Sequence, residues 1–79
     1  MDVQTLRAEA FKALHERERA FLIPNPWDAG SAKLLASLGF EALATTSAGL
    51  ANCRGLMDMA IDRDILLAHV ADLAPATDL

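Results

Sequence analysis

The sequence predicts an α/β fold in which an N-terminal helix precedes two βα units. Two short, mainly apolar runs, "AFLIP" and "FEALATT", read as strands, and each is followed by a segment with helical spacing of its apolar residues. Two strands joined by a helix form a right-handed parallel βαβ unit. Because two parallel strands cannot close a sheet or cover both of its faces, we expect the opening part of a larger α/β protein.

The first element is an amphipathic helix over about residues 3–17. Asp2 stands where a helix N-cap is expected. Apolar residues recur at spacings of three and four on one face: Leu6, Ala10, Ala13 and Leu14. The polar stretch "HERER" is the solvated end of this helix.

The first βα unit covers a strand at about 20–24 and a helix at about 29–38. Pro24 closes the apolar run, and the turn "NPWDAGS" follows with Asn, Pro and Gly. Asp28 is placed to cap the helix. Gly39 is placed at its C-terminal end, where a left-handed residue is common.

The second βα unit covers a strand at about 40–46, a long loop at about 47–61 and a helix at about 62–74. Asp62 is placed to cap the last helix, and Pro75 ends it because proline lacks a backbone N–H. The loop is about three times the usual connection length, and loops of this length in compact folds are commonly functional.

Composition narrows the function classes. The chain has 79 residues, a net charge of −4 and no basic run, so it lacks the electrostatic signature of a nucleic-acid-binding protein. Its single cysteine, Cys53, excludes an internal disulfide and fits a reducing compartment. With no signal-peptide core and no apolar run of 18 residues, we expect a cytoplasmic protein without membrane contact.

The residues after the second strand are the best candidates for a site, because ligands of parallel α/β folds bind at the carboxyl ends of strands. Ser47, Ala48 and Gly49 would let successive backbone N–H groups surround a carboxylate or phosphoryl group. An ordinary strand-end turn would use the same residues. Thr45 and Thr46 are β-branched residues typical of strands, and one of the two is expected to face inward.

Other chemistry-bearing residues have structural alternatives. Asp58, in "GLMD", is a candidate site carboxylate or a solvated turn residue. Trp27 either lines a substrate pocket or serves only to pack against neighbouring side chains. Cys53 is expected to be buried or half-buried, and no base accompanies it. His15 and His69 are not read as catalytic, and no Cys/His spacing typical of a metal site is present.

Three motifs carry a resemblance to a known family: "NPWDAGSA", "TTSAG" and the closing "GLMD". From Phe21 to Leu79 the chain resembles the amino-terminal part of the isocitrate lyase/phosphoenolpyruvate mutase superfamily. It is most similar to short bacterial members described as methylisocitrate lyase-like or carboxyphosphonoenolpyruvate phosphonomutase-like.

This resemblance implies that residues 1–79 are part of a (β/α)8 TIM barrel, homo-oligomeric at full length. It implies a Mg²⁺-dependent lyase that cleaves a C–C bond to give a 2-oxo acid through an enolate. Ser47, with the amides of Ala48 and Gly49, would bind the carboxylate or oxo group of the substrate, and Thr45 would shape the pocket. Asp58 would be the catalytic residue, near the water shell of the metal.

The resemblance also implies what these residues lack. The Mg²⁺ ligands of the family follow later strands, so residues 1–79 alone are expected to be inactive. Cys53, Arg54 and Met57 depart from the family pattern, which leaves the carboxylate or phosphonate substrate open. A phosphonomutase, an oxaloacetate decarboxylase and a non-catalytic interaction module remain alternatives.

Overall fold

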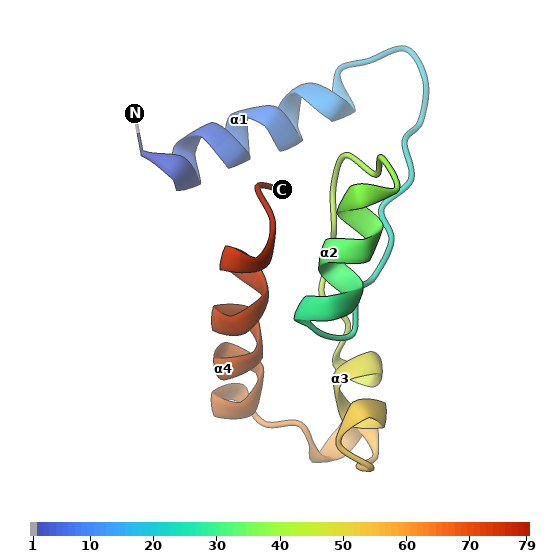
Figure 1. Cartoon of the computed structure of the whole chain (residues 1–79), viewed down its shortest axis with the longest axis vertical. Helices are drawn as coiled ribbons and strands as arrows, with labels where there is room; N and C mark the ends of the chain where they lie inside the picture. Colours follow the sequence, from blue (N-terminus) through green and yellow to red (C-terminus); the bar gives the residue numbers. More distant parts are fainter. Residues whose placement is uncertain (1) are drawn as a thin grey trace.

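The computed structural model describes residues 2–79, and helices are its only regular elements in that range. The four α-helices and two 3-10 turns are α1 (Val3–His15), α2 (Ala29–Ser37), α3 (Ser47–Cys53), η1 (Asp58–Ala60), α4 (Arg63–Leu73) and η2 (Ala74–Ala76). Figure 1 shows α2 and α4 side by side, with α1 crossing one end of the pair and α3 lying at the other.

An aspartate caps the N-terminus of each of three helices. The Oδ1 atoms of Asp2, Asp28 and Asp62 accept the backbone N–H three residues later, at 2.7, 2.7 and 2.8 Å. These bonds satisfy amides that the first helical turn leaves without a partner. At the other end of α2, Gly39 has a φ of +96°, the left-handed conformation expected for the residue that follows a helix.

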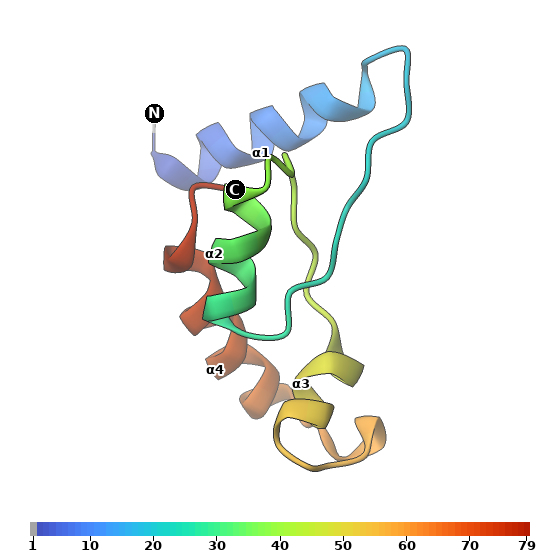
Figure 2. The ribbon, with the colours of Figure 1, turned by 45° about the vertical axis from the view of Figure 1, so that its right-hand side comes forward.

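The two predicted strands do not form within residues 2–79. Their segments are extended and run in the same direction, beside each other, between α1 and α3 (Figure 2). A single backbone hydrogen bond joins them, from the Ala44 N–H to the Pro24 oxygen at 3.1 Å. The two βα units are therefore not confirmed.

Two prolines explain why the pairing stops at one backbone bond. In a parallel ladder through this bond, residue 24 would donate its N–H to Ala42, or residue 26 would donate to Ala44. Both positions are proline, which has no N–H. The Asn25 side-chain amide instead donates to the Ala44 oxygen at 2.9 Å. The segments are thus aligned without forming a ladder.

The segment predicted as a loop over 47–61 contains α3 and η1. The chain turns back after α3 at Gly55, whose φ is +68°, and the Leu56 N–H donates to the Ala51 oxygen at 2.8 Å. This return packs η1 against α3. What the sequence indicated as one open connection is therefore a short helix and a folded-back turn.

The core of the described residues is small. Its buried apolar side chains are Leu14, Ala32, Ala42, Leu50, Ala51 and Leu73. Larger apolar side chains remain on the surface, such as Leu22 at 76% exposed and Met59 at 95%. Much apolar area is therefore left in water, where its burial would otherwise stabilise the fold.

Arg7 attaches α1 to the C-terminal part of the chain. Its guanidinium donates to the oxygens of Ala74 and Thr77 at 2.8 and 2.6 Å. The residues just after α1 are linked to the second extended segment by the exposed ion pair between Arg17 and Glu41, at 3.0 Å. None of the helices described in residues 2–79 has both the length and the apolar character needed to cross a bilayer.

Candidate functional site

The residues "TTSAG" begin a helix. Thr46 is the N-cap of α3: its backbone is extended, its Oγ1 accepts the Gly49 N–H at 3.3 Å, and its oxygen accepts the Leu50 N–H at 3.1 Å. Ser47 and Ala48 form the exposed first turn. Their backbone N–H groups have no acceptor among residues 2–79, as expected at a helix start.

Gly49 is buried and lies against Trp27. A Cβ atom added to Gly49 would come within 2.4 Å of the indole Cδ1, 2.7 Å of its Nε1 and 2.6 Å of Thr46 Cγ2. No side chain fits at these distances, so glycine is required by the close approach of the ring. The turn after the first extended segment thereby contacts the turn after the second.

The backbone on either side of Trp27 is held by Ser31. The Ser31 Oγ accepts the N–H groups of Trp27 and Asp28 at 2.9 and 3.0 Å, while the Ser31 N–H donates to Asp28 Oδ1. This is a reciprocal capping box at the start of α2. The hydrogen bond from the Ser31 N–H lowers the pKa of Asp28 below its ordinary value, and the charge of His69 lowers it further.

Thr45 and Thr46 have different surroundings, as alternation along an extended segment requires. Thr46 caps α3. Thr45 lines a small cavity of about 120 Å³ together with Ala32 of α2 and Val70 of α4. Its predicted role in shaping a substrate pocket remains a prediction.

Asp58 is the first residue of η1 and is exposed. Among residues 2–79, no donor makes a hydrogen bond to its carboxylate. Its backbone oxygen accepts the Ile61 N–H at 3.1 Å. η1 packs against α3, to which the chain returns through the Leu56 N–H bond to the Ala51 oxygen. The carboxylate of Asp58 is free to meet a ligand.

The single cysteine and the two histidines do not belong to the turn that begins α3. Cys53 is exposed, so the expectation that it is buried or half-buried is wrong. His15 bonds to the Phe11 oxygen through Nδ1, at 2.8 Å, and belongs to an aromatic cluster at the end of α1. His69 is buried on α4, and its Nε2 has no hydrogen-bond partner in the described structure.

Sequence reasoning missed two of these roles. Thr46 was treated only as a strand or pocket residue, although a Thr three residues before a glycine amide is a possible cap signal. The second is the effect of His69 on the pKa of Asp28. This effect depends on how α4 lies against α2, which no local sequence pattern indicates.

The described residues do not fit a magnesium site. No group of three or more His, Cys, Asp or Glu side chains within 2–79 could hold a metal ion. Asp58 could contribute at most one carboxylate to the octahedral shell that Mg²⁺ prefers. No step of the chemistry below is therefore assigned to a metal.

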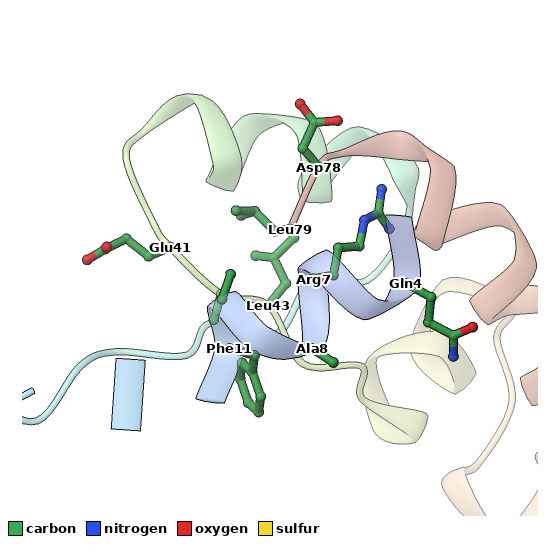
Figure 3. Close-up of a pocket in the computed structure, with 10 residues that line it drawn as sticks. Gln4, Arg7, Ala8, Phe11, Glu41, Leu43, Asp78 and Leu79 are labelled. Atoms are coloured by element: carbon green, nitrogen blue, oxygen red, sulfur yellow. The ribbon is translucent and has the colours of Figure 1, made fainter. Parts of the chain in front are cut away.

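A larger apolar cavity of about 360 Å³ lies away from this site, between α1 and the second extended segment (Figure 3). Arg7 and Phe11 of α1 line it, with Leu43 and the C-terminal Leu79 on its other side. None of the candidate site residues contributes to it.

A helix that begins at the end of an extended segment, with two backbone N–H groups without acceptors among the described residues, is an arrangement suited to binding a small anion. Comparison with known proteins specifies the family. The family model described as "Phosphoenolpyruvate phosphomutase" matches residues 11–79, so the chain belongs to that family. The resemblance expected from the sequence is thereby confirmed.

A solved structure supports this assignment. The crystal structure of a protein from Burkholderia cenocepacia J2315, provisionally assigned as a lyase/mutase, matches with a TM-score of 0.95 and 64% sequence identity. The match covers 99% of this chain and 28% of that one, so the chain spans little more than a quarter of that protein's length. None of the curated proteins matches.

Proposed function

We propose that the protein carrying this chain is a lyase or mutase of a small carboxylate substrate, and that the first turn of α3 binds the carboxylate. The observation that carries this proposal is the pair of free backbone N–H groups at Ser47 and Ala48, beside the Ser47 hydroxyl. Family membership supplies the reaction class, and the crystallographic neighbour is provisionally a lyase/mutase.

The finer proposal is cleavage of a C–C bond to give a 2-oxo acid through an enolate, as in methylisocitrate lyase-like enzymes. An enolate places negative charge on oxygen atoms next to the carboxylate. Hydrogen-bond donors fixed before the reaction stabilise such charge more than water does, since they need no reorganisation. Ser47 and Ala48 are donors of this kind, because α3 and the Thr46 cap fix their backbone.

Gly49 contributes differently from what the sequence indicated. Its N–H already donates to Thr46 Oγ1, at 3.3 Å. It is therefore less available to a substrate than the N–H groups of Ser47 and Ala48. In this proposal Gly49 serves mainly by leaving space for Trp27.

Asp58 is proposed as the proton-transferring or orienting carboxylate of this site. It is exposed, packed next to α3 through η1, and not committed to a side-chain partner within 2–79. A carboxylate placed within one water of a substrate can accept or return a proton. Any Mg²⁺ would take its ligands from outside the described residues, on a TIM-barrel, homo-oligomeric parent.

A substrate screen tests this proposal. The protein carrying this chain is incubated with Mg²⁺ and methylisocitrate, oxaloacetate or phosphonopyruvate, and release or rearrangement is followed by NMR. We expect turnover of one of these acids and weak binding of pyruvate. Absence of both turnover and pyruvate binding would refute the proposal.

A further inference from the structure

We infer that Trp27 is a positioning residue for the turn formed by Thr46, Ser47, Ala48 and Gly49. This inference rests on the proposed function, since it assigns Trp27 to the same site. Trp27 does not belong to that turn, and it lies 19 positions before Thr46 in the sequence. Trp27 therefore influences the turn through the packing of its indole against Gly49.

The first step is the closeness of the contact. The indole occupies the space where any side chain at position 49 would lie, with Cδ1 only 2.4 Å from an added Cβ. The ring also approaches the same space as Thr46 Cγ2, at 2.6 Å from that point. The indole and the methyl group of Thr46 therefore border the same space next to Gly49.

The second step is that Trp27 is itself fixed. Its backbone N–H is held by Ser31 Oγ at 2.9 Å, and Asp28 closes the capping box of α2. Two residues earlier, Asn25 bonds to the Ala44 oxygen at 2.9 Å, just before the turn begins. The ring thus transmits the position of α2 to the start of α3.

The third step concerns exposure. Trp27 is 47% exposed, whereas Gly49 and the following Leu50 are buried. An indole that only filled the core would be covered. Here one part of the ring packs against Gly49 while the rest stays open to solvent. The ring thus supports the turn and leaves part of its apolar surface exposed.

The experiment compares four variants in the protein carrying this chain: Trp27→Ala, Trp27→Phe, Gly49→Ala and Trp27→Ala with Gly49→Ala. Leu38→Ala, at the far end of α2 and 66% exposed, is the matched control. Binding of pyruvate with Mg²⁺ is measured by calorimetry, well below the melting temperature of every variant. Melting temperatures are recorded without ligand.

We expect Trp27→Ala to weaken pyruvate binding about tenfold, which lies within the range of coupling between contacting residues. Trp27→Phe should restore affinity to within about threefold of the wild type, since a ring still supports the turn. Gly49→Ala should lower the melting temperature, and by less when Trp27 is already alanine, because only the clash with Thr46 Cγ2 then remains. Leu38→Ala should change neither quantity.

Wild-type affinity in Trp27→Ala would overturn the inference, as would equal losses in Trp27→Phe and Trp27→Ala. If the wild type itself fails to bind pyruvate, the proposed function fails. Additive melting-temperature changes for Trp27→Ala and Gly49→Ala would overturn the packing contact independently of any ligand.

Discussion

The side-chain amide of Asn25 donates to the backbone oxygen of Ala44 at 2.9 Å, in the position where Pro26 has no N–H to offer. With the Ala44–Pro24 bond at 3.1 Å, it aligns the two extended segments that lead to the candidate site. A side chain here replaces a ladder hydrogen bond.

Asn25→Ala should therefore destabilise the protein by about 1 kcal/mol, the usual net value of one hydrogen bond. Urea unfolding measures this loss. Asn25→Asp, of similar size but without the N–H₂ donor, should cost at least as much. Pro26→Ala introduces a backbone N–H at position 26, which should bond to the Ala44 oxygen and be protected from hydrogen exchange. Rapid exchange of this N–H would contradict the view that the Asn25 side chain takes the place of a missing ladder donor.

Replacing the cap of α3 should loosen the site. Thr46→Ala removes the acceptor for the Gly49 N–H and should cost about 1 kcal/mol, whereas Thr46→Ser should cost much less. Thermal unfolding of the two variants makes the comparison. Equal stabilities for the two would show that the 3.3 Å bond contributes nothing.

The capping box of α2 should make stability fall in acid. The Ser31 backbone hydrogen bond lowers the pKa of Asp28 from 3.8, so this carboxylate stabilises the fold above about pH 4. That contribution is lost as the pH falls through the lower folded-state pKa. Asp28→Asn keeps an acceptor for the cap but does not titrate. We expect its unfolding free energy to depend less on pH between 5 and 2 than that of the wild type, measured by urea titration at each pH.

Substitutions within α3 should separate binding from background. Ser47→Ala should lower turnover of the substrate found in the screen by about a hundredfold, as loss of one preorganised donor does in other enzymes. Cys53→Ala, at the opposite end of α3, is the control and should leave turnover nearly unchanged. Equal activities for the two variants would remove Ser47 from the site.

Residues 1–79 in isolation should unfold without a sharp transition. The described core contains only three leucines and three alanines, and Leu22, Leu38 and Met59 are exposed. Too little apolar area is buried to offset the conformational entropy of ordering the chain. Calorimetry together with sedimentation tests this expectation, and a cooperative transition in a monomeric sample would contradict it.

Hydrogen bonds between residues close in sequence could be predicted from the sequence, whereas pairing between distant segments could not. Asp2, Asp28 and Asp62 cap helices because each bonds an amide three residues away, which the sequence displays directly. The strand predictions for 20–24 and 40–46 rested on apolar content and gave too little weight to the prolines at 24 and 26, which remove the donors that a ladder needs.

The candidate site shows the same division. "SAG" was interpreted as a turn that exposes successive amides, and the amides of Ser47 and Ala48 do lack acceptors among the described residues. That α3 begins there depends on Thr46, and that Gly49 must be glycine depends on Trp27. The second dependence links residues 22 positions apart, which is visible only once the two turns lie together.

The bonds from Arg7 to Ala74 and Thr77 span 67 and 70 residues of sequence. During synthesis α1 is made before α2, α3 and α4, yet the Arg7 guanidinium finds these acceptors only after nearly all of the remaining residues described here have been synthesised. Until then the contact between the rings of Phe11 and Phe21, ten positions apart, links α1 to the growing chain. The docking of α1 through Arg7 is thus a late step, completed only after α2, α3 and α4 have been made.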